Sequence, residues 1–263
     1  MKWQWLVVLL GAAAAQAAEN TRPRDVAFVA RVDGSTQRYV VVLPEPFDPA
    51  KPHSLLVVLH GHGSDRWQYV NHPRDECRAA RDVAAARRMI LVSPDYRATA
   101  SWMGPKAEAD LLQILEDLKG RYRIVKTILC GGSMGGASAL SFAALHPELV
   151  HGVVAMNGTA NHLEYENFQD AIRESFGGSK QAIPQEYKKR SAEYWPERLT
   201  MPLGLTTGGR DAIVPPDSVV RLAGIVRKLQ PNVLLMHRPD GGHATDYSDG
   251  KAALEFVLDK AGL

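Results

Sequence analysis

Short apolar runs alternate along most of the chain with segments whose apolar residues recur at helical spacing. The apolar runs are typical of strands buried on both faces of a sheet, and they lie at residues 54–59, 89–92, 127–130, 150–156, 203–207 and 233–237. Helical spacing marks the segments 77–88, 108–118, 219–229 and 251–261, and the stretch that follows residue 136. Strands that alternate with helices predict a three-layer α/β fold with a mostly parallel sheet.

Two regions depart from this alternation. Residues 26–32 and 37–43 read as strands joined at Asp33-Gly34-Ser35, which predicts a leading antiparallel hairpin. Residues 157–200 are polar, rich in aromatic and charged side chains, and without a strand pattern. We expect them to form a short, irregular or helical, cap-like insertion over the sheet.

The first 17 residues have the features of a secretory signal peptide. Lys2 supplies the positive start, residues 5–15 an apolar core, and Ala15-Gln16-Ala17 a small-residue cleavage site. The sequence therefore predicts a signal peptide at 1–17, a single domain at 18–263, and a secreted or periplasmic protein. Its apolar runs are shorter than the roughly 20 residues of a membrane-spanning helix, so we expect no membrane partner.

Composition narrows the classes of partner. The 263 residues are 45% hydrophobic and 23% charged, as in ordinary globular proteins. The net charge is +2 without a long basic block, so no nucleic-acid partner is expected. Cys77 and Cys130 are the two cysteines. Export would permit a disulfide, but Cys130 closes a buried strand, where a free thiol is the commoner state.

The sequence GGSMGG at 131–136 stands between an apolar run and a helical segment. This is the Gly-x-Ser-x-Gly elbow, in which a sharp turn from strand to helix lifts the serine hydroxyl clear of the sheet. The glycines flank Ser133 because larger side chains would collide with the turn. Ser133 is therefore the candidate nucleophile, and the amide of Met134 points at the oxygen of the attacked carbonyl. The alternative is a serine that only caps the helix.

Two further loops follow strands and carry the partners that a serine nucleophile needs. Asp211 comes after the run at 203–207, and His243 after the run at 233–237. His243 would accept the serine proton, and Asp211 would orient the imidazole and stabilise its charged form. The order Ser, Asp, His is the order of this architecture. Asp240 and Asp246 compete for the acid role, and His237 lies inside a strand and is the poorer base.

The loop HGHG at 60–63 follows the first buried run. The backbone amide of His62 is placed to be the second oxyanion donor. Two histidines one residue apart also resemble half of a zinc site, but Asp65 is followed by Arg66 rather than histidine. We therefore expect no metal and no cofactor.

Several aromatic side chains could line a substrate cleft, with packing in the core or cap as the alternative. Trp102 is the candidate substrate contact, and the others are Tyr165, Phe168, Tyr187, Tyr194 and Trp195.

With these residues, the chain resembles the α/β-hydrolases. It is most similar to small secreted esterases related to the catalytic domain of prolyl oligopeptidases, a group with feruloyl and acetyl-xylan esterase-like enzymes. The resemblance covers roughly residues 40–262. It is carried by HGHGSD at 60, AEADLLQILEDL at 107, GGSMGG at 131, EYKKRSAEYWPERL at 186, GGRDAIVPP at 208 and DGGH at 240. It implies the α/β-hydrolase fold, Ser133, Asp211 and His243 as the catalytic triad, and Met134 and His62 as oxyanion donors.

Two departures from the family bear on the substrate. No β-propeller is expected ahead of the catalytic part, which favours an ester over a peptide. Gly132 stands where the family usually has histidine or a similar residue, which leaves more room behind the nucleophile.

The sequence thus predicts a secreted serine hydrolase that cleaves a small-molecule or polysaccharide-linked carboxylic ester through an acyl-enzyme. A serine peptidase of the same fold is the alternative within catalysis. A hydrolase scaffold that only binds a carbohydrate or polymer is the alternative from another class.

Overall fold

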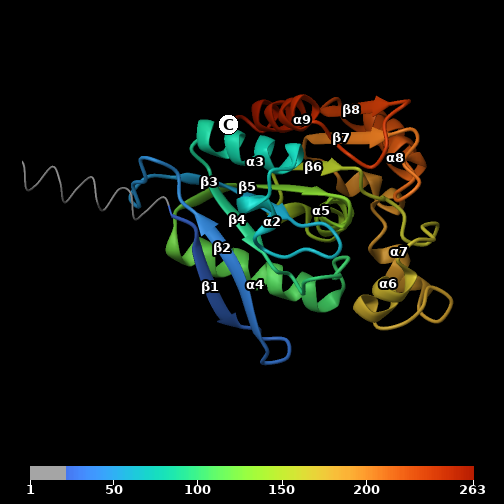
Figure 1. The fold of residues 1–263 in the computed structure, drawn as a ribbon, viewed down its shortest axis with the longest axis horizontal. Helices are drawn as coiled ribbons and strands as arrows, with labels where there is room; N and C mark the ends of the chain where they lie inside the picture. Colours follow the sequence, from blue (N-terminus) through green and yellow to red (C-terminus); the bar gives the residue numbers. More distant parts are fainter. Residues whose placement is uncertain (1–21) are drawn as a thin grey trace, which may run out of the picture.

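The computed structural model describes residues 22–263, so the predicted signal peptide lies outside the described residues. An eight-stranded sheet runs through them in the order β1-β2-β4-β3-β5-β6-β7-β8 (Figure 1). The strands are β1 Arg24–Val29, β2 Thr36–Val42, β3 His53–Leu59, β4 Ile90–Pro94, β5 Ile124–Gly132, β6 Gly152–Met156, β7 Leu203–Gly208 and β8 Val233–Arg238. All pairs from β4 to β8 are parallel, which confirms the predicted mostly parallel sheet.

The leading hairpin is also confirmed. β1 pairs antiparallel with β2, and β2 pairs antiparallel with β4. The first strand ends at Val29 and does not continue to residue 32 as predicted. The chain turns at Ala30, whose amide donates to Ser35 O at 2.8 Å and whose carbonyl accepts from Gly34 N at 2.8 Å. Gly34 has φ +72°, a backbone conformation that glycine adopts without the steric cost of a side chain.

Helices cover both faces of the sheet. The α-helices are α2 Gln68–Asn71, α3 Asp75–Ala86, α4 Pro105–Arg121, α5 Met134–Leu145, α6 Gln169–Phe176, α7 Pro184–Lys189, α8 Asp217–Leu229 and α9 Tyr247–Lys260. Alternate residues of β3 enter different cores, because side chains along a strand point to opposite faces. Leu55 and Val57 pack in the core that holds α4, α5 and α8, whereas Leu56 and Val58 pack with α3 and α9. The fold is therefore the predicted three-layer α/β-hydrolase architecture.

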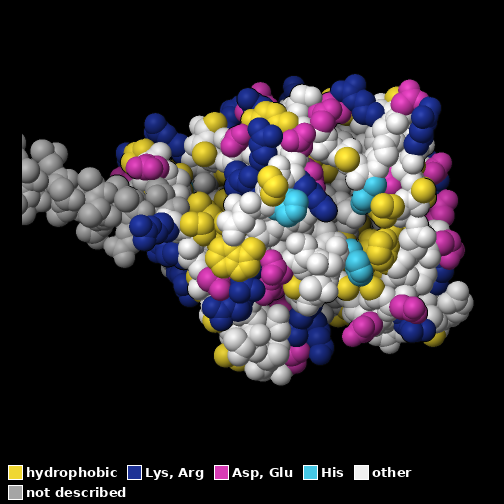
Figure 2. All heavy atoms as spheres, in the orientation of Figure 1, with side chains coloured by type: hydrophobic (Ala, Val, Ile, Leu, Met, Phe, Trp, Pro, Cys, Tyr) yellow, Lys and Arg dark blue, Asp and Glu magenta, His cyan; other side chains and the backbone are white. Residues whose placement is uncertain are grey.

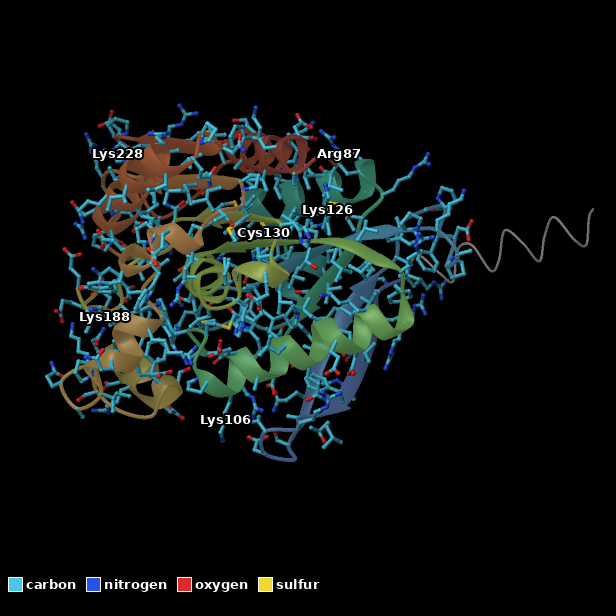
Figure 3. The ribbon with its side chains drawn as sticks, turned by 180° about the vertical axis from the view of Figure 1, so that it is seen from behind. Arg87, Lys106, Lys126, Cys130, Lys188 and Lys228 are labelled. Carbon is cyan, nitrogen blue, oxygen red and sulfur yellow. The ribbon has the colours of Figure 1, made fainter. Side chains whose placement is uncertain are left out.

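Cys77 and Cys130 are buried free thiols on the α3–α9 side of the sheet. Figure 3, which views the molecule from behind, shows Cys130 deep between the layers. Burial raises the pKa of the Cys77 thiol to about 12, so this thiol stays protonated and unreactive at neutral pH. Among residues 22–263, no helix combines the length and the apolar character that crossing a membrane requires.

The insertion at 157–200 contains α6, α7 and the 3-10 helices η2 Ala192–Tyr194 and η3 Pro196–Arg198, and no strand is assigned within it. Figure 1 shows α6 and α7 at the side of the molecule to which β7 and β8 point. The buried Arg190 ties the insertion to the body of the domain. Its guanidinium donates to Met103 O at 2.6 Å, to Glu108 Oε2 at 2.7 Å and to Glu186 Oε1 at 2.7 Å.

Glu108 is the carboxylate of α4 that receives this guanidinium. Burial alone would raise the pKa of Glu108, but the hydrogen bond with His146 and the charge of Arg190 lower it to about 2. Glu108 is therefore ionised at neutral pH and forms a paired, hydrogen-bonded charge beneath the insertion. Removing one partner of such a pair is costly because the other is left buried and unpaired.

The elbow glycines predict a measurable packing constraint. A Cβ on Gly135 would lie 1.9 Å from Leu59 O, so α5 sits against the end of β3 with no room for a methyl group. We expect Gly135→Ala to lower the free energy of unfolding by about 1–3 kcal/mol or more. Gly120→Ala is the matched control, because a Cβ there meets open space in α4. It should raise stability by about 0.5–1 kcal/mol. Urea unfolding measures both, and a Gly135→Ala protein as stable as Gly120→Ala would contradict this packing.

Candidate active site

Ser133 stands between the end of β5 and the first residue of α5 with φ 57° and ψ −122°. A positive φ is uncommon for a residue other than glycine and persists only where the surroundings enforce it. Two backbone hydrogen bonds do so here. Ser133 N donates to Met156 O at 2.8 Å, and Ala137 N donates to Ser133 O at 3.0 Å. The turn therefore has the strained conformation that a nucleophile elbow requires.

The three predicted catalytic side chains meet in one hydrogen-bonded chain. His243 Nε2 lies 2.9 Å from Ser133 Oγ, and His243 Nδ1 lies 2.7 Å from Asp211 Oδ2. With the imidazole proton on Nδ1, that nitrogen donates to the carboxylate and Nε2 is free to accept the serine proton. Both distances are within the reach needed for proton transfer. The arrangement can activate a hydroxyl for attack on a carbonyl carbon.

Asp211 is buried and its carboxylate is held on both oxygens. Oδ1 accepts from Ile213 N and Val214 N, each at 2.9 Å, while Oδ2 faces the imidazole. Two amide donors fix the orientation of this carboxylate. The second oxygen is thus held toward His243 by the turn that follows β7.

Asn157 is a residue of the site that the sequence did not reveal. Its Nδ2 donates to Asp211 Oδ2 at 3.4 Å and to Gly242 O at 3.1 Å. Its Oδ1 accepts from Thr245 Oγ1 at 2.6 Å. Asn157 thereby joins the loop that follows β7 and carries Asp211, here called the acid loop, to the loop that carries His243. The one signal in the sequence was its position directly after the apolar run at 150–156.

The two competing carboxylates have other partners. Asp240 pairs with Arg210 at 2.5 Å, and both side chains are largely exposed. Asp246 caps α9, where its Oδ1 accepts from Asp249 N at 2.8 Å. His237, the alternative base, lies in β8 with Nδ1 2.9 Å from Thr207 Oγ1. Within residues 22–263, Asp211 is the one carboxylate hydrogen-bonded to His243.

The backbone amides of His62 and Met134, beside Ser133, have no hydrogen-bond acceptor among the described residues. The neighbouring amides are occupied, since Gly61 N donates to Gln68 Oε1 at 2.7 Å and Gly63 N donates to Thr99 O at 2.8 Å. A Cβ on Gly61 would lie 3.8 Å from Ser133 Cβ, so the loop after β3 reaches the nucleophile. The site therefore has two free N–H donors that a developing oxyanion could use.

A cavity of about 50 Å³ opens at Ser133 and His243 and is walled in part by Gly61, Gly132 and Thr245. A Cβ on Gly132 would lie 3.3 Å from Tyr69 Oη, so a larger residue would narrow the space behind the nucleophile. Figure 2 shows histidine side chains beside a group of hydrophobic side chains on the face in view. The exposed hydrophobic residues of the molecule include Phe168 and Ile213, on the insertion and on the acid loop.

The structure corrects the expectation for Trp102. This side chain is fully buried, so its ring cannot contact a substrate. Its Nε1 instead donates to His62 Nδ1 at 3.3 Å. Among the other predicted aromatic residues, Tyr165 and Tyr187 are buried, whereas Phe168 and Tyr194 are exposed. Phe168 lies against the His62 ring, with 4.5 Å between the ring centroids.

Residues 22–263 hold no group of three or more His, Cys, Asp or Glu side chains arranged for a metal ion. The imidazole of His60 is buried, and its nitrogens lie 2.8 Å from Gly61 O and 3.0 Å from Asp95 O. The His60 ring therefore contacts backbone carbonyl oxygens through both nitrogens and stabilises the loop at 60–63.

Residues 96–259 match the prolyl oligopeptidase family, which is more than half of the chain. The chain belongs to this family of hydrolases, as the sequence resemblance implied.

Individual known proteins are similar over parts or all of their length. A 2-hydroxy-6-oxononadienedioate/2-hydroxy-6-oxononatrienedioate hydrolase of Burkholderia vietnamiensis is 30% identical over 139 residues, 49% of this chain and 47% of that protein. A similar protein from Paraburkholderia phymatum is 31% identical over the same shares. The chain thus spans about half the length of the curated relatives it matches.

Solved structures show the same fold at low sequence identity. The fluorophosphonate-binding serine hydrolase F of Staphylococcus aureus has a TM-score of 0.70 and 16% identity over 91% of this chain and 98% of its own. A ferulic acid esterase has a TM-score of 0.69 and 20% identity over 92% and 98%. The acylaminoacyl peptidase of Pyrococcus horikoshii has a TM-score of 0.68 and 16% identity over 95% and 42%.

The contacts of the three carboxylates predict the ranking of their amide variants. Asp211→Asn should lower kcat on an ester substrate by about 10⁴-fold, because an amide facing His243 favours the wrong imidazole tautomer. Asp240→Asn should keep nearly full activity, since its partner is an exposed arginine. Asp246→Asn should also stay active, because asparagine caps helices as well as aspartate does. Steady-state kinetics of the three variants measures the ranking, and a crippled Asp240 or Asp246 variant would show that the acid is misassigned.

Proposed function

We propose that the protein is a serine esterase that cleaves carboxylic esters through a covalent acyl-enzyme. The observation that carries this proposal is the continuous hydrogen-bonded chain from Ser133 through His243 to Asp211. The amides of Met134 and His62 lie beside it without an acceptor among residues 22–263. Membership of a hydrolase family supports it. We propose that five residues act in catalysis, three through their side chains and two through their backbone amides: Ser133, His243, Asp211, Met134 and His62.

In the proposed reaction, Ser133 Oγ attacks the ester carbonyl carbon while its proton moves to His243 Nε2. The carbonyl oxygen becomes an oxyanion, which accepts hydrogen bonds from the amides of Met134 and His62. The C–O bond to the alcohol then breaks, and His243 returns the proton to the departing alcohol. A water molecule attacks the acyl-enzyme in the same way and releases the carboxylic acid. Asp211 stabilises the imidazolium in both halves of the cycle.

An ester is favoured over a peptide bond as the substrate. Two of the structural neighbours that this chain covers almost completely are named as a serine hydrolase and a ferulic acid esterase. The family and the acylaminoacyl peptidase neighbour favour a peptidase as the second candidate. Neither candidate uses a metal or an organic cofactor in the proposed chemistry, which is complete with the side chains of the chain and water.

The nucleophile is tested by Ser133→Ala. We expect kcat on a p-nitrophenyl ester to fall by roughly 10⁵–10⁶-fold with the circular dichroism spectrum unchanged, because only the attacking oxygen is lost. Ser248→Ala is the control, since this exposed serine donates its hydroxyl to Asp246 Oδ1 at the start of α9, away from Ser133 and His243 in the hydrogen-bond network. A folded Ser133→Ala protein that retains a tenth of the wild-type rate would exclude Ser133 as the nucleophile.

Substrate and probe assays of the wild-type protein separate the three candidate functions, which are esterase, peptidase and non-catalytic scaffold. An esterase hydrolyses the p-nitrophenyl ester faster than the p-nitroanilide of a matched acyl group, and a dedicated peptidase shows specific turnover of peptide anilides. A fluorophosphonate probe should label the wild-type protein once per molecule at Ser133. A scaffold that only binds a carbohydrate or polymer would give neither labelling nor turnover.

We also propose that the protein is exported, on the basis of the segment at 1–17 in the sequence. Cleavage after Ala17 would then leave a mature chain that starts at Ala18. The intact mass of protein recovered from the periplasm or medium of a bacterial host measures this, and mature protein that still starts at Met1 would contradict export by this route.

A further inference from the structure

The imidazole of His62 forms a cluster with two aromatic side chains from distant parts of the chain, which also contact each other at 5.5 Å between ring centroids. Phe168 of the insertion lies against it, with 4.5 Å between the ring centroids. The Trp102 ring lies 6.1 Å away, and its Nε1–H donates to His62 Nδ1 at 3.3 Å. His62 is exposed, but partial desolvation still lowers its pKa and so favours the neutral ring, which alone can accept this hydrogen bond. The side chain of His62 is therefore held by a ring contact with Phe168 and a hydrogen bond from Trp102.

Phe168 is brought to this place by a tethered turn. Its backbone has φ 54° and ψ 27°, a left-handed conformation that is unusual for a bulky residue, and its side chain stays partly exposed. Asn167 Nδ2 donates to Ala212 O at 3.1 Å and to Ile213 O at 2.9 Å, and Tyr165 Oη donates to Ile213 O at 2.9 Å.

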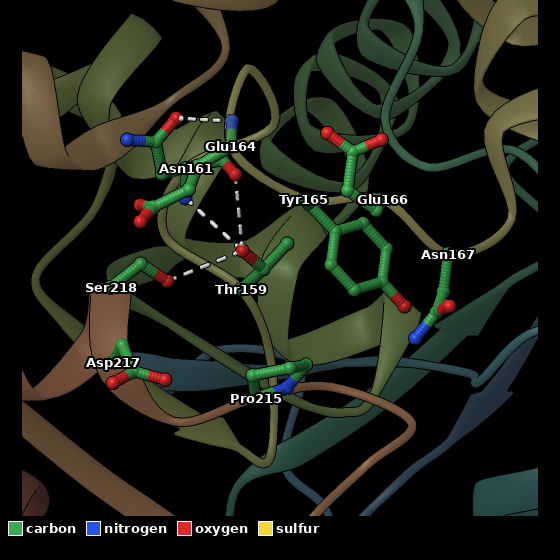
Figure 4. Close-up of a pocket in the computed structure, with 9 residues that line it drawn as sticks. All are labelled: Thr159, Asn161, Glu164, Tyr165, Glu166, Asn167, Pro215, Asp217 and Ser218. Atoms are coloured by element: carbon green, nitrogen blue, oxygen red, sulfur yellow. Dashed lines mark hydrogen bonds between the residues drawn. The ribbon is translucent and has the colours of Figure 1, made fainter.

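Figure 4 shows Tyr165 and Asn167 side by side in the wall of a pocket of about 220 Å³, which also includes Pro215 of the segment leading into α8. The turn at 165–168 thus reaches from the acid loop to the His62 loop.

Trp102 is equally constrained. It is fully buried with φ 46°, and its ring lies 5.5 Å from those of Tyr165 and Phe168. The carbonyl of the next residue, Met103, accepts the hydrogen bond from the buried Arg190 at 2.6 Å. A ring fixed in this way offers a rigid partner to the His62 imidazole.

Hydrogen bonds from Gly61 N to Gln68 Oε1 and from Gly63 N to Thr99 O fix the loop on either side of His62, but the His62 amide between them donates to no acceptor among the described residues. Glycines flank His62 on both sides, and Gly63 has φ +80° with open space where a Cβ would lie. Glycine gives a backbone more conformational freedom than any other residue. An oxyanion donor must nevertheless lie within about 2.7–3.1 Å of the developing charge to stabilise it. The contacts of the His62 side chain add a further restraint on the position of its amide.

We propose that Trp102 and Phe168 are positioning residues, which clamp the imidazole of His62 and thereby hold its backbone amide in the oxyanion hole. This inference rests on the proposed esterase function and goes beyond it. The insertion would then complete the catalytic site through Phe168 in addition to covering it. Neither residue needs to touch the reacting atoms for this role.

The first test removes the hydrogen bond and keeps the ring. Trp102→Phe should lower kcat by about 3–10-fold and leave KM within twofold, because a ground-state ester makes less use of the oxyanion donors than the transition state does. Phe168→Ala should have a similar effect, and Phe168→Tyr, which keeps the stacked ring, should restore the wild-type kcat. Phe176→Leu is the control for core truncation, since Phe176 is buried in the insertion against His162 and Tyr187 rather than His62. It should lower the Tm without changing kcat.

The second test is a double-mutant cycle. His62→Ala keeps the amide and should lower kcat by no more than about tenfold. If Trp102 acts through the His62 ring, Trp102→Phe should have no further effect on kcat in the His62→Ala background. Binding of a phenylboronic acid, which forms a tetrahedral adduct with Ser133, should weaken in the single variants in proportion to kcat/KM.

Losses that add in the cycle, or that fall on KM alone, overturn the clamp while an active wild type keeps the proposed function intact. A wild type without ester turnover or probe labelling would overturn the esterase function itself, and the clamp with it.

Discussion

The close packing of α5 against the ends of β3 and β5 is the constraint on which the site depends. The helix can start directly after Ser133 because Gly131 and Gly135 have no side chains. A Cβ on Gly131 would lie 2.4 Å from the carbonyl carbon of Gly135. Every α5 residue from Met134 to Ala144 is buried, so the helix is fixed by apolar contacts along its length. Burial of this helix offsets the strain of the positive φ at Ser133, which costs on the order of 1–3 kcal/mol.

The parallel sheet then determines which loops can reach the elbow. β5, β6, β7 and β8 are consecutive neighbours, so the loops after their carboxyl ends meet at one edge. Ser133 follows β5, Asn157 follows β6, Asp211 follows β7 and His243 follows β8. The hydrogen bonds of Asn157 join the loop after β7 to the loop after β8. The β3 loop approaches from the other side of β5 and brings the His62 amide.

The insertion at 157–200 contacts the rest of the domain in two places near the site. Arg190 connects it to α4 and to the loop that holds Trp102, whereas Tyr165 and Asn167 connect it to the acid loop. Such contacts make the insertion part of the site's framework. Burying a charge is costly unless its partners are fixed. The buried Arg190, which pairs with Glu108 and Glu186, therefore favours an insertion that stays in place over the sheet.

The sequence by itself determined the features that depend on local pattern. The period of the apolar residues predicted the strands and helices, and the glycine-flanked Ser133 together with the order of Asp211 and His243 predicted which loops matter. These signals are readable because strand burial and the sharp turn impose residue types within a few positions of one another.

Only the tertiary structure showed that Asp211, rather than Asp240 or Asp246, is hydrogen-bonded to His243, found Asn157, and showed that Trp102 is buried behind His62. Those outcomes depend on contacts between residues far apart in the chain. His243 and Ser133 are 110 positions apart, and Trp102 and His62 are 40. No periodicity or local motif encodes a contact of that kind, because it arises when the sheet brings separate loops to one edge and the insertion folds back across them.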